Sequence, residues 1–199
     1  MATTSKHRAT MKAGLEALPP SCRAELIEGE LYTFPRPDAA HSEMQAAIAE
    51  ELRPPFYRGF GGPGDWWILV EPAVTIAGAH EVSPDVAAWR KENLSCLPRH
   101  GHIQIAPDWV CEIHSPATRV YDLSVKRSFY ARMGVKHSWY IDLDSRVVTA
   151  CRLENGAWIE VGTFGSDAAV LIEPFDAIEV DLPELWSGIP PEPADDELT

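Results

Sequence analysis

The chain has 199 residues, 45% apolar and 24% charged, which predicts a single globular domain. Its apolar runs are too short for a membrane helix, which needs about 18 residues, and its polar N-terminus has no secretory signal, so we expect a cytoplasmic protein without a membrane partner. The net charge of −13 argues against an extended DNA-binding surface and allows only a local one, such as the basic residues between 119 and 136, because non-specific DNA binding depends on neutralising phosphates.

The first predicted elements are a hairpin and a helix. After a flexible lead-in over residues 1–24, residues 25–32 predict two short strands joined by a tight turn at Glu28-Gly29. Asp38 can cap a helix that runs to about Leu52. Its apolar stripe, at the spacing of a helix packed on a core, consists of Met44, Ile48 and Leu52.

Strands and a second helix follow. Three apolar runs predict strands over residues 66–76, 82–89 and 109–114. Residues 120–133 predict a helix that ends at Gly134. A meander of three strands is expected over residues 137–143, 147–153 and 158–161. From Pro183 onward we expect a flexible chain, with residues 186–199 as an acidic, proline-rich tail. This order favours a mixed sheet with helices packed on it over an alternating βαβ array.

Two carboxylates interrupt neighbouring apolar runs. Asp85 follows Pro84 in one run, and Glu112 lies in the next. If the two strands pair, both carboxylates come within reach of one cation, and hard divalent ions such as Mg²⁺ prefer oxygen ligands of this kind. Each residue also has an ordinary interpretation. Asp85 could form a turn beside the proline, and Glu112 could mark where its strand reaches the surface.

Lys126 is the third candidate, because it falls within the apolar stripe of its predicted helix. The stripe also contains Leu123, Tyr130 and Met133. A surface helix normally carries lysine on the opposite face, so Lys126 must extend to solvent or find an anionic partner. A site that holds Asp85, Glu112 and a phosphate would provide one. The alternative is an ordinary surface pair with Asp122, one helical turn earlier.

Several short motifs occur in a characteristic order over about residues 25–185. They are residues 25–32 (ELIEGELY), His41, Pro84-Asp85, residues 112–118 (EIHSPAT), Asp122 with Lys126, Tyr130-Ala131, Gly134-Val135 and residues 139–142 (WYID). In these motifs the chain resembles the Uma-type putative restriction endonuclease family of bacteria, a branch of the PD-(D/E)xK nuclease superfamily.

The resemblance implies a mixed α/β (α+β) domain over residues 25–185, with a restriction-endonuclease-like central mixed sheet flanked by helices. It implies an endonuclease that hydrolyses phosphodiester bonds, with DNA as the nucleic-acid partner and Mg²⁺ or Mn²⁺ as the cofactor. The metal ligands that it implies are Asp85, Glu112, the backbone carbonyl of Ile113 and, to complete the shell, Glu71. Lys126 would position the attacking water or neutralise the developing charge.

One position departs from the superfamily pattern, which has a lysine two residues after the acidic ligand. His114 occupies that position, and the resemblance moves the role of the lysine to Lys126. His114 is then a structural residue, a pH-sensitive helper or a sign of altered chemistry. Further candidates for substrate binding at the mouth of the site are His41, Glu28, His114 and Ser115. Helix N-terminal charge and the hairpin turn are the alternative explanations for His41 and Glu28.

Two other functions stay open at this point. The chain could be a non-catalytic regulatory protein that binds nucleic acid or protein and retains the nuclease fold. It could also hydrolyse another phosphodiester, such as a small nucleotide or a single strand, which demands less positive surface. Because nucleases that cut both strands commonly act as homodimers, a homodimer is expected, with exposed tryptophan near Trp186 as a candidate interface.

Overall fold

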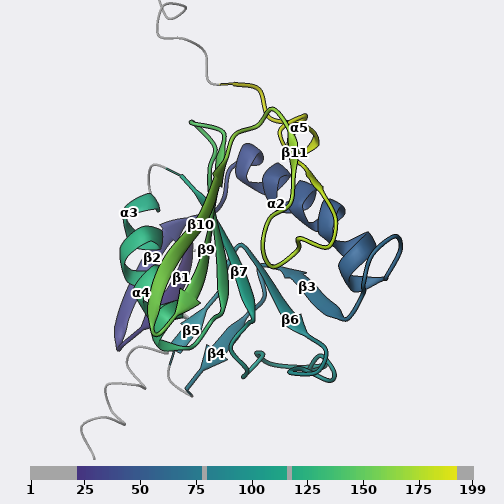
Figure 1. The fold of residues 1–199 in the computed structure, drawn as a ribbon. Coiled ribbons are helices and arrows are strands. Elements are labelled where there is room, and N and C mark those ends of the chain that lie inside the picture. Colours follow the sequence, from purple (N-terminus) through teal and green to yellow (C-terminus); the bar gives the residue numbers. More distant parts are fainter. Residues whose placement is uncertain (1–21, 78–79, 116–117, 192–199) are drawn as a thin grey trace, which may run out of the picture.

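The computed structural model describes residues 22–77, 80–115 and 118–191, and a six-stranded mixed sheet lies at its centre (Figure 1). In spatial order its strands are β10 (Ala157–Phe164), β9 (Val147–Glu154), β8 (His137–Asp142), β7 (Trp109–His114), β6 (Val86–Arg90) and β3 (Trp66–Val70). β7 and β8 pair in parallel, and the other neighbours pair antiparallel. The sheet is therefore mixed, as the order of the predicted elements suggested.

A second, smaller sheet is built around the N-terminal hairpin. In spatial order it contains β2 (Glu30–Pro35), β1 (Cys22–Ile27), β5 (His80–Val82) and β4 (Val74–Ile76). A short two-stranded ladder joins β11 (Ala169–Val170) and β12 (Val180–Asp181).

Helices cover both faces of the central sheet (Figure 1). The first helix of the described residues, α2 (Ala39–Leu52), continues into a wide turn, η1 (Arg53–Tyr57). A second helical segment consists of α3 (Arg119–Tyr121), the wide turn η2 (Asp122–Lys126) and α4 (Arg127–Arg132). The short α5 (Leu182–Leu185) packs in the same cluster as α2. Among the described residues, no helix is long and apolar enough to cross a membrane.

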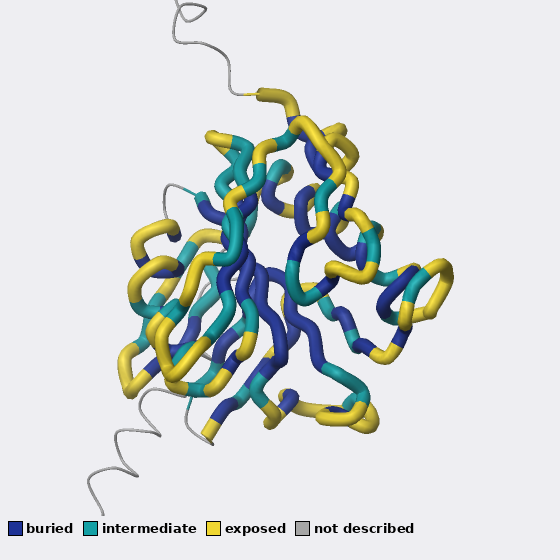
Figure 2. Tube along the Cα trace, in the orientation of Figure 1, coloured by how far each residue is buried: buried dark blue, intermediate teal, exposed yellow. Residues whose placement is uncertain are grey.

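β7 separates two apolar clusters, and all six of its residues are buried (Figure 2). Because side chains alternate along a strand, Cys111 and Ile113 pack into the cluster that contains α2, whereas Val110 packs into the cluster that contains α4. Glu112 follows the same alternation and faces the helical segment α3–η2–α4. A carboxylate is thereby enclosed by protein beneath this helical segment.

Most of the predicted elements are confirmed. In the hairpin, Ile27 pairs with Glu30, and the two turn residues Glu28 and Gly29 have φ values of 53° and 83°, as a tight two-residue turn requires. The Asp38 side chain caps α2 by accepting the N–H of His41 at 2.9 Å. The stripe of α2 is buried as predicted, and β7, β8, β9 and β10 lie at the predicted positions.

Two predicted strands are each divided in two. The run over residues 66–76 breaks at Glu71, whose φ of 44° is left-handed, and its halves β3 and β4 belong to different sheets. The run over residues 82–89 divides into β5 and β6 around residues 83–85. The prediction of one continuous strand in each run was wrong, because an apolar run does not reveal where the chain crosses from one sheet to another. Both breaks place an acidic residue, Glu71 or Asp85, outside a strand.

The predicted stripe of the second helix was also incorrect in part. Leu123 is exposed, and the buried side of the segment is formed by Tyr121, Asp122, Lys126, Phe129 and Tyr130. Lys126 is on the inward side as expected, but the wide turn η2 changes which residues share that side with it.

The ends of the folded domain lie further out than predicted. β1 begins at Cys22, so ordered structure precedes residue 25. Trp186 and Ile189 are buried in the cluster that contains α2, which contradicts both a flexible chain from Pro183 and an exposed tryptophan at this position. Trp186 therefore gives no support to a homodimer interface. Residues 192–199 of the predicted tail lie outside the described residues.

Candidate active site

Asp85 lies one residue before β6, where its carboxylate accepts hydrogen bonds from several directions. Val86 pairs with Cys111 across β6 and β7, so the condition under which the two carboxylates come close, pairing of their strands, is met. Asp85 Oδ2 accepts the N–H of Ile113 at 2.8 Å, which fixes the carboxylate beside Glu112. The side chain is almost completely buried.

Three side-chain nitrogens surround the other oxygen of Asp85. Oδ1 lies 3.1 Å from Arg23 Nη1, 3.0 Å from His41 Nε2 and 3.5 Å from Gln45 Nε2. Burial by itself raises the pKa of Asp85, but the hydrogen bond and charge of His41, together with nearby Lys and Arg charges, outweigh burial and hold the pKa well below its ordinary value. Asp85 is therefore an ionised carboxylate.

Glu112 and Lys126 form a buried ion pair. Lys126 Nζ donates to Glu112 Oε2 at 2.8 Å, and the Tyr130 hydroxyl donates to Glu112 Oε1 at 2.6 Å. Burial raises the pKa of Glu112, and the charge of Lys126 opposes that shift. For Lys126 itself, burial lowers the pKa, but Glu112, Glu25 and Asp122 outweigh burial and raise it above the ordinary value. Lys126 thus stays cationic inside the protein.

Glu25 on β1 is a member of the site that was not among the candidates. Its Oε1 lies 3.2 Å from Lys126 Nζ and accepts the N–H of Ser83 at 2.9 Å, and its Oε2 accepts the Tyr121 hydroxyl at 2.6 Å. Arg23 lies two residues earlier on the same face of β1. One sequence signal could have revealed both residues. Arg23 and Glu25 carry opposite charges at alternate positions of a short strand, so both side chains lie on one face of it, and that face can be the one that packs on the protein.

Glu71 lies next to Asp85 and shares two of its hydrogen-bonding partners, Gln45 and Arg23. Glu71 Oε1 lies 3.1 Å from Gln45 Nε2 and 3.7 Å from Arg23 Nη1. Gln45 and Arg23 therefore each contact both carboxylates. Glu71 is a partly exposed residue after β3 and not a mid-strand residue, so its partners come from α2 and β1 rather than from the central sheet.

The remaining candidates lie at three places. His41 contacts Asp85, and Ser115 lies nearby with its hydroxyl 3.2 Å from that of Thr118. His114 stacks on Tyr140, and its Nδ1 lies 3.5 Å from Asp122. Glu28 is not brought to the site, because it lies at the hairpin turn and pairs with Arg132 on α4.

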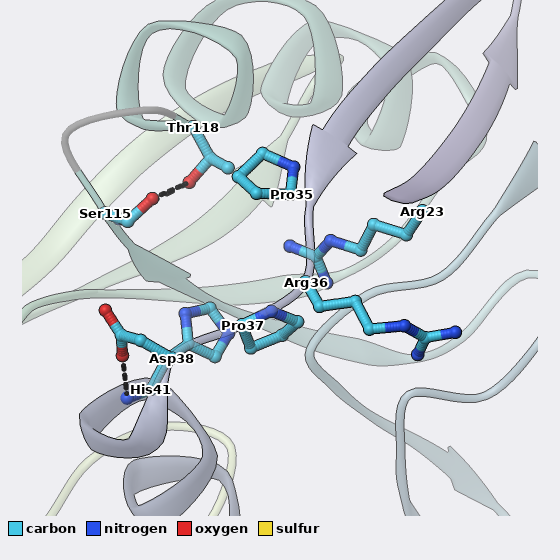
Figure 3. Close-up of a pocket in the computed structure, with 8 residues that line it drawn as sticks. All are labelled: Arg23, Pro35, Arg36, Pro37, Asp38, His41, Ser115 and Thr118. Atoms are coloured by element: carbon cyan, nitrogen blue, oxygen red, sulfur yellow. Dashed lines mark hydrogen bonds between the residues drawn. The ribbon is translucent and has the colours of Figure 1, made fainter. Parts of the chain in front are cut away.

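A pocket of about 370 Å³ opens beside Asp85. Figure 3 shows Ser115 and Thr118 on one side of it, Asp38 and His41 on another, and Arg23 and Arg36 opposite them. Its lining residues are Arg23, Pro35, Arg36, Pro37, Asp38, His41, Ser115 and Thr118. Two arginines and a histidine thus gather at one place on a chain whose net charge is −13.

The carboxylates of Asp85 and Glu71 are oxygen ligands of the kind that a hard divalent cation takes. Within residues 22–77, 80–115 and 118–191, no three His, Cys, Asp or Glu side chains already stand in the arrangement of a metal site. However, Asp85 and Glu71 both lie close to one cationic atom, Arg23 Nη1. Carboxylates that share a guanidinium nitrogen can also share an ion that prefers oxygen ligands.

The comparisons with known proteins agree with this architecture. The model of the Uma2 family, described as "Putative restriction endonuclease", matches residues 13–183. The chain is similar to a crystal structure described as a putative nuclease belonging to DUF820 from Anabaena variabilis, with a TM-score of 0.62, 23% identity, and coverage of 89% of this chain and 97% of the other. This likeness confirms the predicted mixed α/β, restriction-endonuclease-like fold. No curated protein matches the chain.

Proposed function

The chain belongs to the Uma2 family of putative restriction endonucleases, and from this premise we propose that it is a metal-dependent nuclease that hydrolyses phosphodiester bonds in DNA. The single observation that carries the proposal is the buried group formed by Asp85, Glu112 and Lys126 next to a cationic pocket. Buried charges are costly unless they are paired. Their concentration where the start of β6, β7 and η2 meet favours a chemical role over a purely structural one.

The residues near Asp85 would hold the metal ion. Asp85, Glu71 and the Ile113 carbonyl supply the oxygen ligands that Mg²⁺ or Mn²⁺ prefers, with Glu112 adjacent on β7. When bound, the ion polarises the scissile phosphate and lowers the pKa of a bound water.

Protein groups would orient the water and balance charge. Lys126 has three hydrogens, and Glu112 and Glu25 accept at two of these positions, so the third could be donated toward the water or toward a phosphate oxygen. Tyr130 holds the opposite oxygen of Glu112 and thereby fixes the carboxylate that orients Lys126. Arg23 and Arg36 in the adjoining pocket would neutralise the phosphates of the strand.

The pocket also answers the objection raised by the net charge. Nucleic-acid binding requires positive charge only along the path of the backbone, and Arg23 and Arg36, which line the pocket together with one acidic residue, Asp38, would provide it next to Asp85. A strand held over the pocket would bring a phosphate to Asp85 without an extended basic surface.

One observation favours a second function. Each carboxylate oxygen of Asp85 and Glu112 already contacts a donor of the protein, as expected for a non-catalytic protein that retains the fold as a binding module. Metal binding discriminates between the two functions, because a module of this kind has no need for an ion.

The test combines Mn²⁺ binding with cleavage. Wild type, Asp85→Asn and Glu112→Gln would be titrated with Mn²⁺ by calorimetry and then incubated with supercoiled, linear and single-stranded DNA. Glu154→Gln on β9, an exposed acidic residue far along the sheet, is the control for loss of one negative charge. We expect binding and cleavage in wild type and the control, and loss of both in the site variants. Mn²⁺ binding that persists in Asp85→Asn, or DNA cleavage without any metal, would contradict the proposal.

A further inference from the structure

Arg23 occupies a position between two carboxylates of the site. Its Nη1 lies 3.1 Å from Asp85 Oδ1 and 3.7 Å from Glu71 Oε1, and its side chain is 20% exposed. The guanidinium therefore contributes the positive charge that offsets two acidic groups held close together.

A divalent ion and this guanidinium compete for the same oxygen. An ion bound to Asp85 Oδ1 and Glu71 would lie next to Arg23 Nη1, and like charges at such a separation repel strongly in a poorly solvated site. Oδ2 of Asp85 is held by the amide of Ile113, so a metal must bind at Oδ1. His41 and Gln45 also contact Oδ1, but Arg23 is the partner whose positive charge is permanent. Arg23 must then move away from the carboxylates.

The adjoining pocket provides a place for the displaced side chain. Arg23 itself lines this pocket with Arg36 and His41 (Figure 3). Since the long side chain of Arg23 already borders the open space, rotation about its side-chain bonds could carry the guanidinium into the pocket. A phosphate in the pocket could then bind the Arg23 guanidinium through two hydrogen bonds, in place of the two carboxylates.

We propose that Arg23 exchanges between the Asp85–Glu71 carboxylates and a phosphate of the nucleic-acid strand, so that metal binding and strand binding assist each other. The inference rests on the proposed function, because it presumes that both a metal and a strand bind here. It assigns Arg23 as a positioning residue that couples the two ligands. By linkage, each ligand must strengthen the other by the same factor.

Three measurements on Arg23→Gln test the exchange. Mn²⁺ affinity without DNA would be measured from the electron paramagnetic resonance signal of free Mn²⁺. Binding of a fluorescent 20-nucleotide DNA strand would be measured by anisotropy, first in EDTA and then with Ca²⁺, which takes similar oxygen ligands. Arg23→Lys keeps the charge. Arg132→Gln is the matched control, since it removes an exposed arginine that pairs with Glu28 at the hairpin turn.

The exchange predicts effects of opposite sign. Arg23→Gln should bind Mn²⁺ at least about fivefold more tightly than wild type, and Ca²⁺ should strengthen DNA binding at least about fivefold in wild type but little in the variant. Arg23→Lys should lie nearer to wild type, and Arg132→Gln should match it. Thermal unfolding would establish that each variant is folded.

The outcomes separate this inference from the proposed function. If wild type binds no Mn²⁺, the proposed function fails and the exchange fails with it. If wild type binds Mn²⁺ but Arg23→Gln binds it equally or more weakly, only the exchange is overturned. The same holds if Ca²⁺ strengthens DNA binding equally in wild type and Arg23→Gln, because Arg23 would then make no use of the phosphate.

Discussion

Lys126 Nζ on the helical segment lies 2.8 Å from Glu112 Oε2 on the central strand, and both side chains are almost completely removed from solvent. Two further carboxylates, Glu25 and Asp122, lie 3.2 Å and 3.9 Å from the same ammonium. Lys126 is therefore the common cation of three acidic groups from three elements. Such an arrangement depends on every partner, because each charge that loses its partner remains buried.

Replacing Lys126 by methionine should destabilise the fold strongly. The volume is nearly conserved, but Glu112 loses its ion-pair partner, and breaking a buried pair from one side costs about 3–5 kcal/mol. The double variant Lys126→Met with Glu112→Gln should recover part of that loss, because one of the unpaired charges is then neutral. Urea unfolding followed by circular dichroism measures both free energies. A single variant within about 0.5 kcal/mol of wild type would show that the buried pair does not stabilise the fold.

Removal of the Tyr130 hydroxyl should cost more than removal of a comparable exposed hydroxyl. Tyr130 donates to Glu112 at 2.6 Å in a buried setting, and a hydrogen bond to a charged group contributes about 1.5–3 kcal/mol. Tyr32 donates to Glu30 at 2.9 Å on the surface, so Tyr32→Phe is the matched control and should cost less than about 0.5 kcal/mol. Equal unfolding free energies for the two phenylalanine variants would contradict the role given to Tyr130.

The parts of the site that could be predicted are those in which one residue conflicts with its local pattern. Glu112 in a fully buried strand and Lys126 on the inward side of a helix are conflicts of this kind, and both residues lie at the site. Glu25 and Arg23 were missed because β1 is short and half-buried, so charges there look like ordinary surface residues. Their importance depends on how β1 pairs and what it faces, which is long-range information.

The fold shows the same division between local and long-range information. Turns and caps, such as that of Asp38 on α2, were predictable because the hydrogen bond closes within three residues. The break at Glu71 was not predictable, because the chain passes there from one sheet to another, and the sheet to which each half belongs depends on distant strands. Burial of Trp186 also depends on distant partners, in this case α2 and the central sheet.

Stability should decrease as the pH falls below about 6.5, in part through His137 on β8. Burial lowers the pKa of His137, and its Nδ1 lies 3.9 Å from Glu173, which opposes the shift only in part. Since the folded-state pKa is below the unfolded value of about 6.5, the unfolded chain binds a proton first as the pH falls. The contribution is therefore complete above about pH 6.5 and is lost as the pH falls through the folded-state pKa.

The variant His137→Gln isolates this contribution from those of the other histidines. Its free energy of unfolding should change less with pH than that of wild type between pH 7.5 and pH 4.5, when both are measured by urea unfolding at intervals of one pH unit. Identical pH profiles for the two proteins would exclude His137 as a source of acid sensitivity.

Trp186 should be a core residue, although the sequence suggested a tail at this position. Its side chain is 1% exposed, the Arg146 guanidinium lies 5.3 Å from its ring centroid, and its backbone carbonyl accepts a hydrogen bond from Arg146 at 3.2 Å. Trp186→Ala should therefore destabilise the protein by about 3–5 kcal/mol, as for other buried tryptophans. Leu171→Ala, at an exposed apolar residue, should change stability by less than about 0.5 kcal/mol. Both are measured by thermal and urea unfolding. If Trp186→Ala is as mild as Leu171→Ala, the segment that contains α5 does not contribute to the core, and the folded domain ends before it.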